Sequence, residues 1–162
     1  MRFLHTPLTS TKAITIYLLC LFQPAISLAT ENALIITNAW IQEAPPNTKI
    51  MAGYMSLTNN SNEPVTIRSI TSQSFGKIEP HRTLHKDGIA KMVSLKKLTV
   101  PEQGSITFKP GSYHLMMFSP EKPLLSGDTV TVSFQLDNHP AINQRFLVRR
   151  EPAIAEKKDH HH

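Results

Sequence analysis

Short segments of alternating apolar and polar residues, set apart by turn residues, restrict the fold of this chain more than any other feature. Residues 65–70 alternate clearly, and the turn at 59–62 (Asn-Asn-Ser-Asn) precedes them. Alternation with a period of two is typical of strands buried on one face, and no segment shows the helical period of 3.6 residues. We therefore expect an all-β domain, built as an antiparallel β-sandwich or barrel.

Nine strands are expected from this pattern. The sharpest turn between two of them is Asp87-Gly88, a dipeptide that favours a two-residue hairpin loop. A loop rich in Pro and Gly, 119–128, precedes the last two strands. The expected strands are 34–41, 51–58, 65–70, 77–83, 89–95, 105–109, 113–118, 129–136 and 142–149.

The first 29 residues have the character of a signal peptide. Arg2 and Lys12 flank a start without acidic residues, and the apolar run at 13–22 is too short to span a membrane. Ser27-Leu28-Ala29 places small residues at the two positions that signal peptidase reads. We expect cleavage after Ala29 and export to the periplasm.

Cleavage would remove the only cysteine, Cys20. Leu19 is not the small residue that a lipid-modification site requires before its cysteine, so we expect neither a lipid nor another stable membrane anchor. The mature chain would then comprise one β domain, 30–150, held together without disulfides, and a polar tail, 151–162, that we expect to be disordered.

The charge of the mature chain is modest. Removing Arg2 and Lys12 from 17 basic residues leaves 15 against 12 acidic residues, a formal net charge of +3. Without a concentrated basic surface, we expect no nucleic-acid partner. No Ser-His-Asp or paired-carboxylate arrangement suggests a hydrolase, and we do not expect an enzyme.

The strand expected at 113–118 carries an imidazole and a thioether on one face. Side chains two residues apart share a face, so His114 and Met116 project together, whereas Tyr113, Leu115 and Met117 project to the other face. A histidine in an apolar strand is more often a hydrogen-bonded core residue than a metal ligand. Taken alone, this pair therefore favours a structural role.

The Asp87-Gly88 hairpin supplies a second pair of this kind. If these two residues form the loop, Thr83 lies opposite Met92, and His81 and Met92 are diagonal neighbours on one face. A three-residue loop would shift the register by one and separate them. His85 shares this face but lies nearer the turn, where we expect it to be exposed.

Two imidazoles and two thioethers make a soft and largely neutral set of donors. Thioether sulfur selects Cu(I) over Zn(II), Mg(II) or Ca(II). It needs no deprotonation, and it cannot form a disulfide outside the cytoplasm, where thiols are at risk of oxidation. The donor set therefore suits a Cu(I) site in an exported protein.

The spacing of these four residues resembles the motif of the PCuAC family of periplasmic Cu(I) chaperones. Ten residues separate His81 from Met92, twenty-one separate Met92 from His114, and one separates His114 from Met116. The similarity extends over about 35–148. It includes 37–40 (Thr-Asn-Ala-Trp), 45–46 (Pro-Pro), 52–55 (Ala-Gly-Tyr-Met), 109–116 (Lys-Pro-Gly-Ser-Tyr-His-Leu-Met) and 123–124 (Pro-Leu).

The resemblance implies a cupredoxin-like β-sandwich that binds one Cu(I) near its surface through His81, Met92, His114 and Met116. It also implies delivery to the copper-centre subunit of cytochrome c oxidase, directly or through a thioredoxin-like copper protein. We expect a monomer. One departure is visible, because Arg82 and Thr83 follow His81 where many members of the family carry a further Met.

The residues alone leave other functions open. The protein could sequester copper for tolerance, or it could be an adhesion module without metal, although Trp40 is its only Trp. A blue-copper carrier needs a Cys ligand that the mature chain would lack. A copper monooxygenase needs an N-terminal His, whereas we expect Thr30. The terminal run His160–His162 could bind Cu(II).

Overall fold

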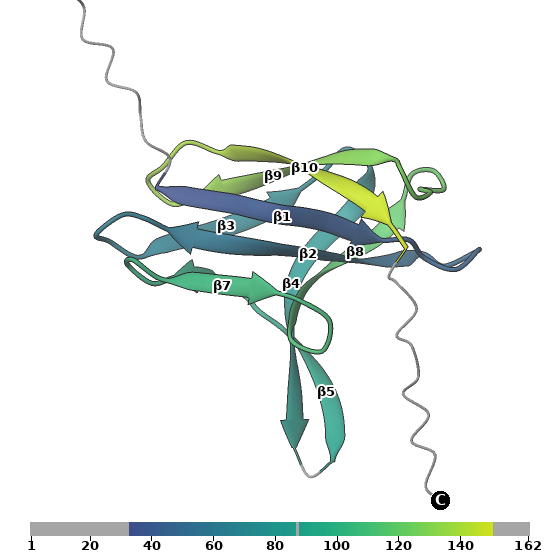
Figure 1. The fold of residues 1–162 in the computed structure, drawn as a ribbon, viewed down its shortest axis with the longest axis horizontal. Coiled ribbons are helices and arrows are strands. Elements are labelled where there is room, and N and C mark those ends of the chain that lie inside the picture. The colour runs from purple at the N-terminus through teal and green to yellow at the C-terminus, as the bar shows by residue number, and fades with distance from the viewer. Residues whose placement is uncertain (1–32, 87, 151–162) are drawn as a thin grey trace, which may run out of the picture. The chain divides into compact units, whose positions relative to one another are not determined.

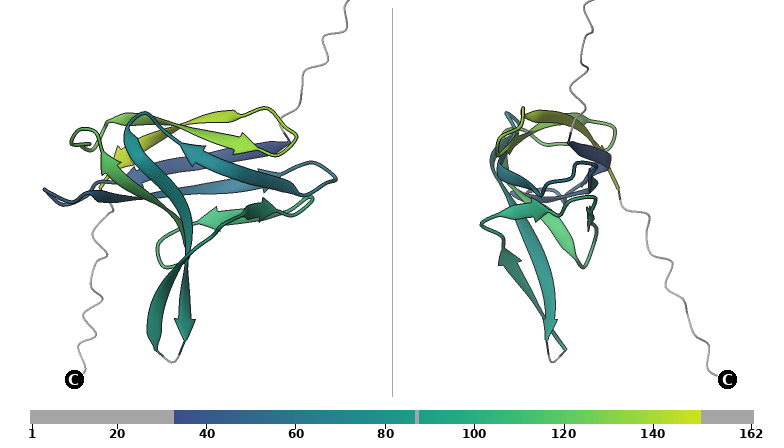
Figure 2. Two further views of the ribbon diagram at one scale, coloured as in Figure 1. Left: turned by 180° about the vertical axis from the view of Figure 1, so that it is seen from behind. Right: turned by 90° about the vertical axis from the view of Figure 1, so that its left-hand side faces the viewer.

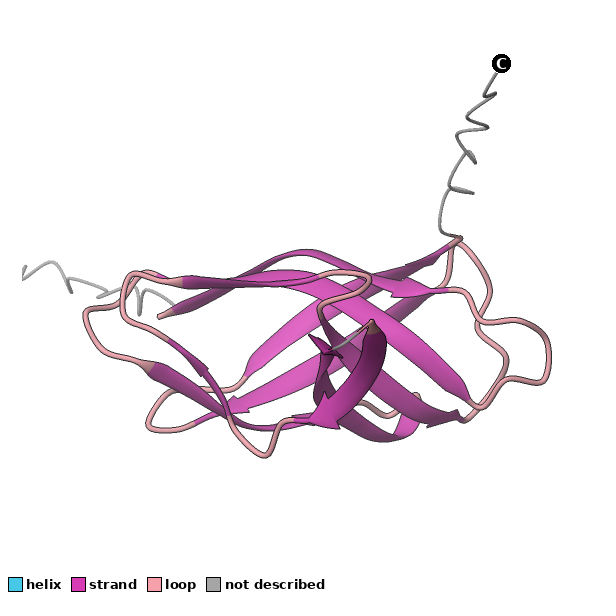
Figure 3. Ribbon diagram, turned by 90° about the horizontal axis from the view of Figure 1, so that it is seen from below, coloured by secondary structure: helices cyan, strands magenta, loops and turns pink. Residues whose placement is uncertain are grey.

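The computed structural model describes residues 33–86 and 88–150, so the expected leader, Cys20 and the histidine tail lie outside the described residues. This part of the chain consists of strands and loops (Figure 3), and no helix in it is long and apolar enough to cross a membrane. The predicted all-β class is confirmed. The strands are β1 (Leu34–Gln42), β2 (Ile50–Asn59), β3 (Val65–Thr71), β4 (Phe75–Lys86), β5 (Ile89–Ser94), β6 (Leu98–Val100), β7 (Ser105–Phe108), β8 (Tyr113–Pro120), β9 (Thr129–Leu136) and β10 (Ile142–Arg149).

The strands form one sheet in the order β5-β4-β8-β7-β2-β1-β10-β9-β3-β6, and β8 also pairs with β2. The sheet curls on itself (Figures 1 and 2), and the buried apolar side chains pack together inside it. Most neighbours are antiparallel, as predicted, but β1 runs parallel to β10 and β7 makes a parallel contact with β8. Alternation along a strand predicts which face is buried but carries no information about the direction of its partner.

The apolar interior follows from the alternation of the strands. In β9 every second side chain is buried and the side chains between them are more exposed. The rings of Phe134 and Phe146 stack across β9 and β10 with their centroids 6.3 Å apart. Burying each large apolar side chain contributes about 1.5–3 kcal/mol to folding. The buried residues of these two strands are Val130, Val132, Phe134, Leu136, Phe146 and Val148.

Strand β6 was not predicted, because three residues are too few to show a period. A fully buried amide, that of Asn59 at the end of β2, helps to hold this strand in place. Its Nδ2 donates towards the carbonyl oxygens of Val100 and Pro101 at 3.2 Å and 2.9 Å, and its Oδ1 accepts from the backbone N–H of Ser61 at 2.9 Å. These bonds satisfy a polar group whose burial would otherwise be costly.

Close approach of β8 to β2 favours a glycine at position 53. Gly53 pairs with Leu115, and a Cβ at position 53 would lie 3.0 Å from the Sδ of Met117 and 3.3 Å from the Cβ of Leu115. Leu115 and Met117 are fully buried, as expected for the inner face of β8. The alternation of the strand therefore turns His114 and Met116 to the opposite face.

The hairpin of β4 and β5 extends beyond the rest of the sheet. β4 pairs with β8 as far as Arg82, but from Leu84 to Lys86 its only strand partner is β5, at the edge of the sheet. The hairpin consequently projects from the curled sheet (Figures 1 and 2). Lys86 pairs with Ile89, and Gly88 has a φ of 75° that favours glycine, so the predicted two-residue register is confirmed.

Candidate metal centre

The pairing of β4 with β8 places two imidazoles side by side. His81 lies directly opposite His114 in the register of these strands, and their ring centroids are 5.9 Å apart with a tilt of 43°. Directly paired residues share a face of the sheet. His114 is buried and His81 is partly buried, so the two rings are held at the surface of the sheet and are not freely solvated.

Met116 and Glu79 extend this face by one further pair. Met116 lies two residues beyond His114 on β8, and its partner on β4 is Glu79, two residues before His81. The four side chains therefore form a block of two rows on one face. Met116 is partly exposed, whereas its neighbour Met117 is fully buried in the core, as the alternation predicted.

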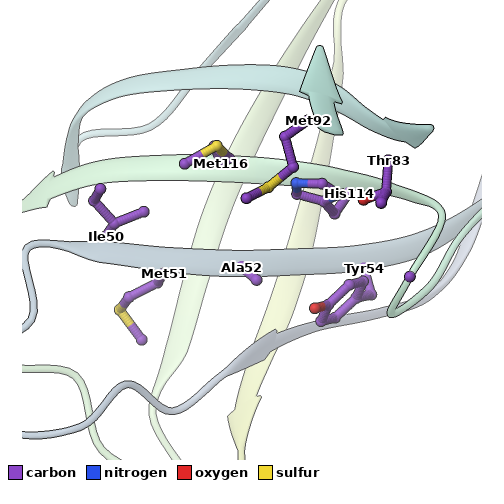
Figure 4. A pocket seen from close by; sticks show the side chains of 9 residues that line it. Ile50, Met51, Ala52, Tyr54, Thr83, Met92, His114 and Met116 are labelled. Atoms are coloured by element: carbon purple, nitrogen blue, oxygen red, sulfur yellow. The ribbon is translucent and has the colours of Figure 1, made fainter. Parts of the chain in front are cut away.

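Met92 reaches the same face from the projecting hairpin. It pairs with Thr83, which makes it the diagonal neighbour of His81, as predicted. Its thioether extends from β5 towards the His114 ring (Figure 4), and 62% of the residue is exposed. A hollow of about 300 Å³ is lined by Met92, His114 and Met116, with Thr83, Ala52 and Tyr54 around them. The register of β4 with β5 and β8 thus places all four sequence-predicted residues on one face of the sheet, and three of them, Met92, His114 and Met116, line the hollow, whereas His81 lies beside His114 outside its lining.

Hydrogen bonds fix both rings. The Nδ1 of His114 lies 3.1 Å from the carbonyl oxygen of Ser112, and the Nε2 of His81 lies 3.2 Å from the Oε2 of Glu79. The Nδ1 of His81 is buried and has no hydrogen-bond partner among the described residues. Buried polar atoms are nearly always paired, so a lone imidazole nitrogen here indicates a place for a ligand.

The carboxyl group of Glu79 was missed by sequence reasoning. The ammonium group of Lys77, 2.7 Å from the other carboxylate oxygen, and the His81 ring lower its pKa below the ordinary value, so it is a negative charge next to the imidazoles. A glutamate in a half-exposed strand is usually solvated, so its presence did not indicate a site. The spacing Glu79-x-His81 shows that the two side chains share a face, but it does not show that they interact.

Two imidazoles and two thioethers are soft donors without net charge. Within the described ranges, no three His, Cys, Asp or Glu side chains are arranged so that they could hold a metal ion by themselves. Thioether sulfur with neutral imidazole suits a soft monovalent cation such as Cu(I). His85 shares the hairpin face but is exposed and is not part of the hollow.

Comparison with known proteins shows the family of the chain. Residues 34–148 match the model of a family described as "Putative lipoprotein LpqE-like". An "Uncharacterized protein RP573" of Rickettsia prowazekii is 33% identical over 89 residues, which are 54% of this chain and 49% of that protein. This chain therefore matches about half the length of that relative.

Solved structures share the fold. The CuI-DR1885 solution structure from Deinococcus radiodurans superposes with a TM-score of 0.60 at 28% identity, over 78% of this chain and 87% of that one. The copper-bound PCuAC domain from PmoF2 superposes with a TM-score of 0.62 at 14% identity, over 74% of this chain and 94% of that one. The predicted resemblance and the cupredoxin-like β-sandwich are confirmed.

Proposed function

Because this chain belongs to the LpqE-like family and has the fold of PCuAC domains, we propose that it is an exported copper chaperone whose cargo is one Cu(I) ion. His81, Met92, His114 and Met116 hold the ion. One observation carries this proposal: the strand register places two imidazoles, paired across β4 and β8, on the same face of the sheet as two thioethers.

The chemistry of the four donors supports a monovalent copper ion. Imidazole binds metal through an unprotonated nitrogen, and thioether sulfur carries no proton to lose. The bond from the Nδ1 of His114 to the carbonyl of Ser112 leaves its Nε2 with a free lone pair. Neutral nitrogen and sulfur donors favour Cu(I), and the site needs no cysteine thiolate, which would be open to oxidation in the periplasm.

The exposure of Met92 favours delivery over sequestration. Sequestration is best served by ligands enclosed in protein, whereas Met92 is 62% exposed on a hairpin that stands away from the rest of the sheet. A partner's ligand can approach the ion on that side and replace the thioether. The acceptor is a copper-centre subunit of cytochrome c oxidase or a thioredoxin-like copper protein, as the family resemblance implies. Copper leaves as cargo, so the protein is not an enzyme.

The periplasm is the compartment that fits this role. The family is described as "Putative lipoprotein LpqE-like", and lipoproteins are exported proteins, which supports this location although we expect no lipid on this chain. We propose that residues 1–29 are the leader that directs it. The tail histidines, His160–His162, would add a separate Cu(II)-binding position.

Competition against a Cu(I) chelator such as bathocuproine disulfonate tests the proposal. Reduced protein of residues 30–162 carrying Met92→Ala or His114→Ala should bind Cu(I) tenfold or more weakly than the parent, a loss of at least about 1.4 kcal/mol. His85→Ala is the matched control, because it removes an exposed imidazole from the same hairpin face. If both site variants compete like the parent, the ion is bound elsewhere.

A further inference from the structure

Glu79 lies on the same face of the sheet as the proposed copper ligands. It shares the face of His81 on β4 and lies directly opposite Met116 on β8. Its carboxylate is partly shielded from solvent, with 28% of the side chain exposed. Glu79 contacts Lys77 at 2.7 Å through Oε1 and His81 at 3.2 Å through Oε2, so it is placed to orient the His81 ring.

The hydrogen bond to Glu79 determines which nitrogen of His81 carries the proton. An ionised carboxylate can only accept, so the Nε2 of His81 must be the N–H donor. A neutral imidazole has one N–H, which leaves the Nδ1 of His81 unprotonated. This Nδ1 is also the buried atom that lacks a partner among the described residues.

His114 has the opposite arrangement. Its Nδ1 lies 3.1 Å from the backbone carbonyl of Ser112, and a carbonyl oxygen only accepts, so Nδ1 carries the proton and Nε2 is free. The two rings, paired across adjacent strands, therefore present different nitrogens.

From these contacts we infer that Glu79 is a positioning residue that makes His81 bind Cu(I) through Nδ1, while His114 binds through Nε2. This inference rests on the proposed function, because it specifies how two of the proposed ligands act. A carboxylate that accepts the far N–H of a ligating imidazole fixes the ring and increases its basicity.

Silver(I) provides a direct probe of the bound nitrogens, because it is a soft monovalent ion whose nuclei couple to ¹⁵N. Protein of residues 30–162 labelled with ¹⁵N and loaded with one equivalent of Ag(I) should show silver–nitrogen coupling at the Nδ1 of His81 and the Nε2 of His114. Coupling at the Nε2 of His81 would overturn the inference while leaving the proposed function intact. Absence of coupling at both rings would instead contradict the proposed function.

Variants of Glu79 test its positioning role. Glu79→Gln keeps an acceptor but loses the charge, and Glu79→Leu loses both, so Cu(I) affinity should fall in that order, by about 10-fold to 100-fold for the leucine variant. In Glu79→Leu the silver coupling of His81 should no longer be confined to Nδ1, a change that loss of stability alone would not produce. Glu102→Gln, an exposed carboxylate in a turn, is the control. Parental affinity together with unchanged coupling in Glu79→Leu would refute the role.

Discussion

At the scale of single residues, the face to which a side chain points decides whether it can take part in the site. Met92 and its neighbour Val93 lie on opposite faces of β5, opposite Thr83 and Arg82 respectively. Exchanging them (Met92→Val with Val93→Met) keeps the composition of the strand and moves the thioether to the wrong face. Chelator competition should show Cu(I) affinity reduced tenfold or more, as for loss of Met92. Parental affinity in the exchanged protein would mean that Met92 is not a ligand.

Short-range geometry predicted two pairs from the sequence, and the resemblance to the PCuAC family joined them into one set of four proposed ligands. His114 and Met116 are two residues apart on one strand, and the Asp-Gly turn sets the register that joins His81 to Met92. The pairing of His81 with His114 depends on β4 meeting β8, which no local pattern encodes. The role of Glu79 depends on that same long-range pairing, and for this reason it was found only in the structure.

At the scale of elements, an ion pair joins the ends of the two parallel strands β1 and β10. The guanidinium of Arg150 donates to both carboxylate oxygens of Glu43, at 3.0 Å and 3.2 Å, and the N–H of Ser126 donates to the first of them at 3.1 Å. These bonds, that of Arg150 above all, hold the pKa of Glu43 below its ordinary value of 4.5. Arg150 is 80% exposed, so solvent weakens the effect.

The lowered pKa of Glu43 gives a pH-dependent contribution to stability. A carboxyl group with a lower pKa in the folded state stabilises that state above its unfolded pKa, and this contribution is lost as the pH falls through the folded value. Glu43→Gln should therefore lower the free energy of unfolding at pH 7, and the difference from the parent should shrink below about pH 4.5. Urea unfolding at pH 7 and pH 3, with Glu102→Gln as control, measures this. An equal difference at both values would contradict it.

Elements were predicted best where the pattern is long. Strands such as β9, with four alternating buried residues, were placed correctly, whereas the three residues of β6 lie below the length at which alternation can be detected. The parallel pairing of β1 with β10 also could not be predicted from the sequence pattern. Whether two distant strands run parallel or antiparallel is set by the path of the whole chain, not by either strand alone.

At the scale of the whole molecule, we expect the folded site and the histidine tail to bind copper in different oxidation states. The folded site is rich in sulfur and suits Cu(I), whereas a run of imidazoles offers nitrogen donors that suit Cu(II). Deleting 156–162 should leave Cu(I) affinity unchanged and remove any second, Cu(II)-binding equivalent. Titration of the truncated and full mature proteins with both ions decides this. Loss of Cu(I) binding on truncation, or Cu(II) uptake that survives it, would show the division to be wrong.

The central claim, that one Cu(I) is held by two imidazoles and two thioethers, is tested most directly by X-ray absorption at the copper edge. The sample is the reduced protein of residues 30–155 loaded with one equivalent of Cu(I), so that the tail cannot contribute ligands. The account predicts a Cu(I) edge and a first coordination shell of two nitrogen and two sulfur neighbours, with one sulfur lost in Met116→Leu. A first shell without sulfur, or one unchanged by Met116→Leu, would contradict it.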